Sequence, residues 1–112
     1  MIHCTCNHVP GYQVKKILGL VHGSSIRSAH LGQDITAFLK NLVGGELEEY
    51  TKMMAECREQ SLDRMNDMAE HLGANAVISI RFSTSDVASG AAEILVYGTA
   101  VSVEKEKEPT NQ

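Results

Sequence analysis

Alternation of apolar and polar positions predicts four strands in this chain, in two pairs. The predicted strands cover residues 2–9, 14–25, 76–83 and 93–103. The Pro10-Gly11 turn pair separates the first two strands. The charged residues 104–112 show no apolar periodicity, so we expect a solvated, frayed tail there. A single domain then spans residues 1–103.

Between the second and third strands the apolar period becomes helical. The apolar face of a first helix is formed by Ile35, Phe38, Leu39, Leu42 and Val43. Gly44-Gly45 ends that helix, and a second helix of about 25 residues runs from Glu46 to a stop at Gly73. The resulting order, β-β-α-α-β-β, predicts a two-layer α+β fold with an antiparallel or mixed sheet and helices on one face.

Several apolar strand positions have no obvious cover. In the second strand Ile17, Gly19 and Val21 fall on one face and Leu18 and Leu20 on the other. In the last strand the two faces are again both apolar: Ile94, Val96 and Ala100 alternate with Leu95, Tyr97, Val101 and Val103. Two helices cannot cover both faces of one sheet. We therefore expect the remaining face to meet another subunit, unless loops cover it.

Composition narrows the class of function. The 112 residues are 43% apolar and 21% charged, as in a single globular domain. A net charge of −4, 4% aromatic residues and no Trp argue against a nucleic-acid partner. No apolar run approaches the roughly 18 residues of a membrane span, and the first residues lack a signal-peptide pattern. Three cysteines make no disulfide framework, so we expect free thiols in a reducing cytoplasm.

Cys4 and Cys6 are the sharpest chemical feature of the sequence. At positions i and i+2 of a strand both thiols point to one face, with His8 next in line. Two thiolates and an imidazole suit Zn²⁺ or Cu⁺. A closed tetrahedral site needs a further ligand, which only a neighbouring subunit offers, so we expect the purified protein to hold little metal. The alternative is that both cysteines are small apolar strand residues.

The other polar candidates do not form a complete catalytic set. His22 and His30 suit acid–base chemistry in a pocket between subunits, but no matched carboxylate or nucleophile motif accompanies them. Asp34 is a further isolated charge. Arg81 and Glu93 lie on strands that we expect to pair, which predicts a cross-strand ion pair.

The second helix contains further residues with possible chemistry, and each has a structural interpretation. We expect Cys57 to lie in the core and His71 to cap the last turn. The helix also carries methionines that we expect in the core or at subunit contacts: Met53, Met54, Met65 and Met68. No phosphate-binding loop or nucleophile elbow occurs, and the sequence identifies no cofactor.

Four segments together resemble the YbjQ-like family of small bacterial and archaeal proteins. They are Leu18-Gly19-Leu20-Val21-His22-Gly23, Gly44-Gly45, Gly73-Ala74-Asn75-Ala76-Val77-Ile78 and Tyr97-Gly98-Thr99-Ala100-Val101. The resemblance covers residues 1–103. It implies an α+β subunit that assembles into a ring, a pentamer, without enzymatic activity. The family is labelled for heavy-metal binding, and its biochemical role is not established.

The chain departs from this family pattern at two places. Glu46 stands where family members tend to have Arg after the glycine pair. Cys4 and Cys6 interrupt a first strand that tends to be rich in Thr. The two cysteines therefore cannot be taken over as ligands common to the family.

Overall fold

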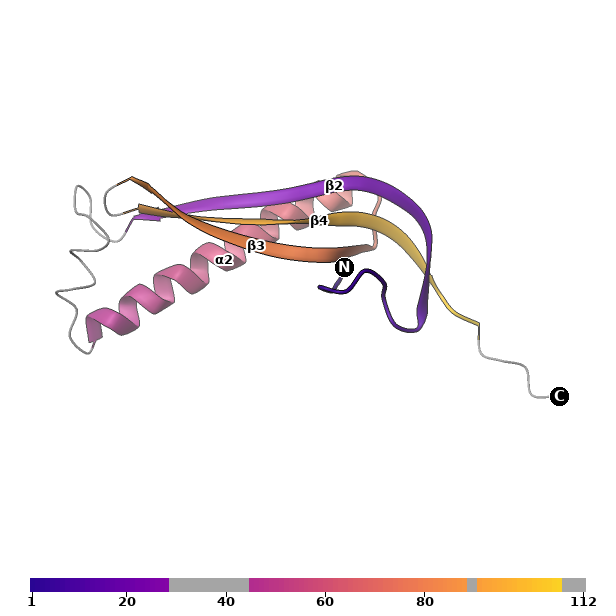
Figure 1. Cartoon of the computed structure of the whole chain (residues 1–112), viewed down its shortest axis with the longest axis horizontal. Helices are drawn as coiled ribbons and strands as arrows, with labels where there is room; N and C mark the ends of the chain where they lie inside the picture. Colours follow the sequence, from indigo (N-terminus) through magenta and orange to yellow (C-terminus); the bar gives the residue numbers. More distant parts are fainter. Residues whose placement is uncertain (29–44, 89–90, 108–112) are drawn as a thin grey trace.

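The computed structural model describes residues 1–28, 45–88 and 91–107 (Figure 1). The described elements are β1 (Ile2–His3), β2 (Tyr12–Ser28), α2 (Gly45–His71), β3 (Ala76–Ala88) and β4 (Ala91–Lys105). The predicted α+β class is confirmed. The helix predicted over residues 35–43 and its Gly44 stop lie outside the described residues, as do His30 and Asp34.

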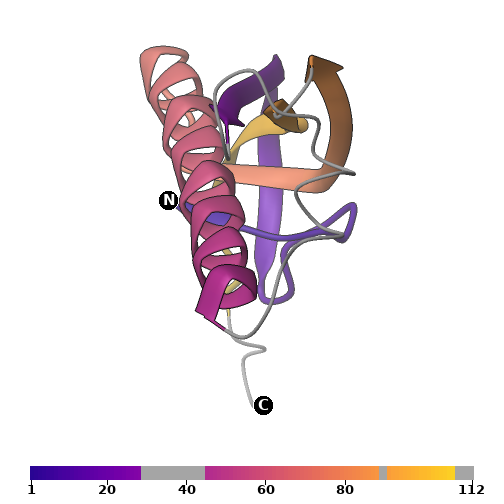
Figure 2. The same cartoon turned by 90° about the vertical axis from the view of Figure 1, so that its left-hand side faces the viewer.

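The strands form one mixed sheet in the order β1-β3-β4-β2. β1 pairs with β3 in parallel, whereas β4 pairs antiparallel with both β3 and β2. α2 lies on one face of this sheet, over β2 and β4 (Figure 2). The predicted mixed sheet with a helix on one face is therefore confirmed for the described residues. β2 forms an edge of the sheet along its whole length.

Close contact between α2 and β2 holds the two layers together. A Cβ atom at Gly23 would overlap the backbone carbonyl of Ser61 and lie 2.5 Å from the backbone nitrogen of Met65. Only a residue without a side chain lets the helix backbone lie directly on the strand. The Cys57 thiol donates to the carbonyl of Ser25 at 3.3 Å, which confirms that this cysteine is part of the core.

Ser61 interrupts the apolar stripe of α2 for a structural reason. Its hydroxyl lies 3.0 Å from the carbonyl of Cys57 and 2.9 Å from that of Ile94 on β4. Beside it, the Ser25 hydroxyl donates to the side-chain carbonyl of Gln60. These bonds satisfy polar groups that burial would otherwise leave without water. Both serines are fully or almost fully buried.

The end of α2 follows the prediction. Gly73 adopts a φ of +82°, its N–H donates to Glu70 at 2.9 Å, and the N–H of Ala74 donates to Ala69 at 3.1 Å. This pair of bonds is a Schellman motif, in which glycine readily takes the left-handed conformation. The His71 Nδ1 lies 2.8 Å from the carbonyl of Asp67, which confirms its capping role.

The predicted division of β2 into two faces is wrong. A bulge between Ile17 and Gly19, where Gly19 has a φ of +137°, changes the alternation. Leu18 consequently packs with Val21 in the core beneath α2, together with Met65, Ala69, Val77 and Val96. Ile17 and Leu20 share the opposite face of the sheet. Of the methionines, Met65 is fully buried and Met68 is exposed.

The strand limits also differ from the predicted ones. The first strand comprises only Ile2–His3, because the chain turns away from regular pairing after Cys4. The last strand runs from Ala91 to Lys105 and so takes in Glu104, which we expected in the tail. Glu104 pairs with Gln13 of β2, and the N–H of Glu106 donates to the carbonyl of Gly11 at 2.9 Å.

Gly23→Ala tests the contact between α2 and β2. We expect the added methyl group to lower the free energy of unfolding by about 1–3 kcal/mol, because the overlap involves helix backbone. Urea unfolding followed by circular dichroism measures this change. Ser24→Ala, one residue along the same strand, is the matched control and should stay within about 0.5 kcal/mol of the parent. Equal stability of both variants would contradict the proposed close approach.

Candidate functional site

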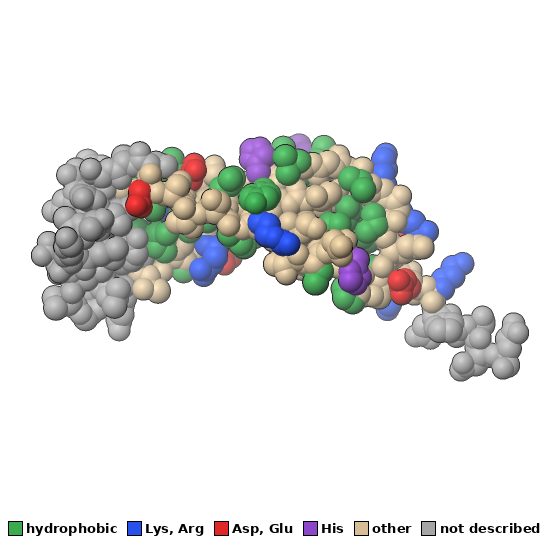
Figure 3. Space-filling model, viewed as in Figure 1, with side chains coloured by type: hydrophobic (Ala, Val, Ile, Leu, Met, Phe, Trp, Pro, Cys, Tyr) green, Lys and Arg blue, Asp and Glu red, His purple; other side chains and the backbone are tan. Residues whose placement is uncertain are grey.

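One face of the sheet carries apolar side chains that nothing in the described chain covers. Ile17 is 70% exposed, Leu20 is 67% exposed and Ile26 is 55% exposed. All three lie on β2 and point away from α2, because their neighbours Leu18, Val21 and Ser25 contact the helix side. We call the sheet face opposite α2 the outer face. In Figure 1 part of α2 passes behind β2 and β4, and Figure 3, viewed from the same side, shows hydrophobic side chains at the surface.

The amino-terminal segment covers one end of the outer face. Val9 is buried there in a second cluster, with Ala76, Ile78, Val101 and Val103. Cys4 and Tyr12 pack against the same cluster. Loops therefore cover part of this face, as the alternative interpretation required. The stretch of β2 and β4 that carries Leu20, Ile26 and Tyr97 remains exposed.

A polar row crosses the middle of the outer face. The strand register sets His22 opposite Tyr97, and Tyr97 opposite Arg81. His22 and Arg81 are exposed. The predicted ion pair between Arg81 and Glu93 is wrong, because the same register sets Glu93 opposite Ser85. A bulge between Ile78 and Arg81 fixes this register, with Ser79 at a φ of +55°.

Arg81 is engaged with the amino-terminal segment instead. One guanidinium nitrogen, Nη1, donates to the carbonyl of Thr5 and to that of Ile80, each at 2.8 Å. Thr5 lies between Cys4 and Cys6, the two cysteines singled out in the sequence. Arg81 thus sets a positive charge beside the turn that carries both thiols.

Residues Cys4 to His8 form a turn rather than the predicted regular strand. The Cys4 thiol lies 3.5 Å from the carbonyl oxygens of Cys6 and His8. Cys4 is half-buried, Cys6 is exposed, and both are free thiols. The His8 ring is hydrogen-bonded to Asn7, with Nδ1 and Oδ1 3.1 Å apart. Among the described residues, no three His, Cys, Asp or Glu side chains form a metal-binding cluster.

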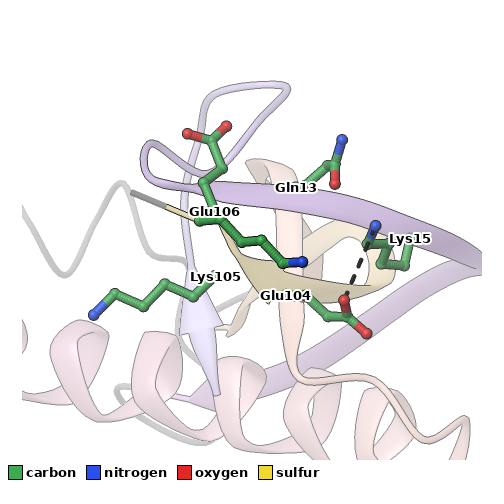
Figure 4. Close-up of a pocket in the computed structure, with 6 residues that line it drawn as sticks. Gln13, Lys15, Glu104, Lys105 and Glu106 are labelled. Carbon is green, nitrogen blue, oxygen red and sulfur yellow. Dashed lines mark ion pairs between the residues drawn. The ribbon is translucent and has the colours of Figure 1, made fainter. Parts of the chain in front are cut away.

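A shallow depression of about 480 Å³ lies where β2 begins and β4 ends (Figure 4). Its lining is polar and mostly charged: Gln13, Lys15, Glu104, Lys105, Glu106 and Lys107. The Lys15 Nζ and a Glu104 carboxylate oxygen lie 4.0 Å apart, and both side chains are largely exposed. Such an exposed pair contributes little to stability. Lysine and glutamate side chains both line the depression, so its charge favours neither an anionic nor a cationic ligand.

Ile26 is a residue that the sequence analysis missed, because the second strand was expected to end at Ser25. The signal in the sequence was the run Ser25-Ile26-Arg27, which continues the polar–apolar alternation. A second missed signal was Gly19. A glycine inside a strand often marks a bulge, and a bulge shifts every following side chain to the other face.

Comparison with known proteins confirms the resemblance drawn from the four motifs. A family model described as "Putative heavy-metal-binding" matches residues 1–104. A UPF0145 protein of Thermotoga maritima is 56% identical over 105 residues, which cover 94% of this chain and 99% of the relative. A UPF0145 protein of Pyrococcus furiosus is 50% identical over 107 residues, covering 96% of this chain and 94% of the relative.

A solved structure shares the fold. The crystal structure of a protein of unknown function from Pediococcus pentosaceus, assigned to the DUF74 family, superposes with a TM-score of 0.62. The alignment covers 93% of this chain and 98% of that chain, at 16% sequence identity. Among the described residues of our chain, no helix has both the length and the apolar character needed to span a bilayer.

Two truncations test the extension of β4 beyond Val103. Removal of residues 108–112 should leave the free energy of unfolding unchanged. Removal of residues 104–112 also deletes the pairing of Glu104 and Lys105 with β2, which should cost about 1–3 kcal/mol. Urea unfolding of both truncated chains measures the difference. If the two chains were equally stable, the terminal pairing would contribute nothing.

Proposed function

Because the chain belongs to the YbjQ family, we propose that it is a non-enzymatic subunit that assembles with copies of itself into a closed ring. The observation that carries this proposal is the exposed apolar row Ile17, Leu20 and Ile26 on the outer face. Monomeric proteins rarely leave such a row open to water, and a second copy offers the same chain a way to bury it.

The shape of the chain supports assembly. Its radius of gyration is 18.5 Å. A compact domain of this length has a radius of roughly 13 Å. An elongated two-layer chain buries less of its own apolar surface than a compact one does, so it gains more from packing against a neighbour. The ring and its five copies are what the family resemblance implies.

Charge and cysteine content support two further parts of the proposal: that the protein has no nucleic-acid partner and that it is cytoplasmic. The solvent side of the helix carries exposed carboxylates: Glu56, Glu59, Asp63, Asp67 and Glu70. These carboxylates outnumber the exposed basic residues Lys52, Arg58 and Arg64 of the same helix, and the whole chain has a net charge of −4, which supports the absence of a nucleic-acid partner. Three free cysteines support a reducing compartment, the cytoplasm.

Replacing Ile17 and Leu20 with Ser tests the assembly surface. Size exclusion with light scattering should give the parent protein several times the 12.2 kDa chain mass, fivefold for a pentamer. Both side chains are mostly exposed in the single chain, so folding should persist. Burial of each side chain at a subunit contact contributes about 1.5–3 kcal/mol to the free energy of association. The double variant should therefore self-associate at least about 100-fold more weakly than the parent.

Gln13→Ser is the matched control for this variant, since Gln13 is an exposed polar residue of the same strand. It should assemble as the parent does. A parent protein that stays monomeric at micromolar concentration would refute the proposal. If the Ile17→Ser/Leu20→Ser protein assembled normally, the outer face would not be the assembly surface.

A second candidate function is binding of a soft metal or another thiophilic ligand through Cys4 and Cys6. It is favoured by one observation: two free thiols, the half-buried Cys4 and the exposed Cys6, belong to the same turn beside the Arg81 guanidinium. The description of the family model as heavy-metal-binding is consistent with a soft-metal ligand. It specifies neither residues nor ion.

A further inference from the structure

We propose that the turn of residues 4–8 is a two-coordinate site for a soft monovalent cation of the Cu⁺ class, with the thiolates of Cys4 and Cys6 as its ligands. The inference deepens the second candidate function and is independent of assembly, because both ligands belong to one chain. It assigns the residues, the number of ligands and the class of ion.

The turn is held in place before any ion binds. The N–H of Cys4 donates to Val77 at 3.1 Å, and the carbonyl of Cys4 accepts from Ile80 at 3.2 Å. The carbonyl of Cys6 accepts from Ser79 at 2.8 Å. These bonds fix the backbone of both cysteines against β3. Little backbone freedom is therefore lost on binding, which favours affinity.

We infer that rotation of the Cys6 side chain can bring the two thiols together. The Cys4 sulfur lies 3.5 Å from the backbone carbonyl oxygens of Cys6 and of His8, so it faces the segment that carries the second thiol. Cys6 is exposed, so packing does not restrict its rotamer. Rotation about one side-chain bond of Cys6 moves its sulfur toward or away from the sulfur of Cys4.

Among the described residues, neither nearby imidazole joins the two thiols in a group of three possible ligands, which limits the number of ligands. His8 is hydrogen-bonded to Asn7, and His3 is hydrogen-bonded to Asn66 of α2. Cys57 is fully buried between α2 and β2. Zn²⁺ requires four ligands in tetrahedral geometry, which this part of the chain does not assemble. Soft thiolates select Cu⁺, for which we expect two sulfur ligands to suffice.

Charge favours a monovalent ion as well. Binding replaces two S–H protons by one cation, so two protons pass to solvent and the bound group carries one net negative charge. The Arg81 guanidinium, bonded to Thr5 between the cysteines, lies beside that charge and compensates it. Because protons are released, binding should strengthen as pH rises.

Titration of the reduced full chain with Cu⁺, in competition with bicinchoninate under anaerobic conditions, tests the site. We expect one Cu⁺ per chain. Cys4→Ser and Cys6→Ser should each weaken binding by roughly 100-fold or more, since either change leaves a single sulfur ligand. His8→Ala should change the affinity less than threefold, as should Cys57→Ser, the matched control for a thiol outside the turn. Zn²⁺ should bind at least 100-fold more weakly than Cu⁺.

Other outcomes would overturn the proposal. An equal loss in His8→Ala would mean a third ligand, and Zn²⁺ binding as tight as Cu⁺ binding would mean a tetrahedral site. Retention of Cu⁺ by Cys4→Ser would mean a lone-thiol contact. The Ile17→Ser/Leu20→Ser protein should bind Cu⁺ as the parent does, so a failure of assembly and a failure of the metal site are distinguishable. Circular dichroism of each variant verifies that it is folded.

Discussion

The contact between α2 and β2 at Gly23 is the constraint on which the rest of the structure depends. A helix that lies backbone to backbone on an edge strand cannot also cover the far side of the sheet. α2 therefore covers β2 and β4, while the hydrogen bonds of Cys57 and Ser61 satisfy the polar groups trapped beneath it. The two faces of the sheet are therefore covered to different extents. The helix covers one face, and the amino-terminal segment covers only one end of the other.

The edge formed by β2 carries features that protect an open strand from pairing with other chains. Long open edges invite strand addition from other chains. Here two bulges interrupt the edge. Lys15 lies in the first bulge, Lys16 follows it, and the Arg64 guanidinium donates to the carbonyl of Ser24. These features disfavour further backbone pairing along β2. The exposed side chains of Ile17, Leu20 and Ile26 remain available for the contact through the outer face that we propose.

The sequence alone was sufficient to predict those features that depend only on residues close together in the chain. Gly73 marks the end of α2 because a left-handed residue is needed there, and the stripe through Cys57 and Met65 identifies the buried side of the helix. The faces of β2 and the partner of Arg81 could not be derived in this way. Both depend on bulges, and a bulge is fixed by pairing between residues far apart in the chain: Ile17 with Val101, and Arg81 with Tyr97. For the same reason the turn at Cys4 was mistaken for a strand.

That turn also explains how a departure from the family pattern can acquire chemistry without new architecture. The backbone bonds from Val77, Ser79 and Ile80 hold residues 4–6 by their main chain, so they do not require particular side chains at these positions. Cysteines can therefore stand where the family tends to have threonine without loss of the anchoring bonds. In the proposed site, a change of the Cys6 rotamer would bring the two thiols together. The acidic character of the whole chain adds long-range attraction for a cation, while Arg81 compensates the anionic complex at close range. In the proposed site the fold would supply rigidity and charge, and the two thiols would supply the preference for a soft ion.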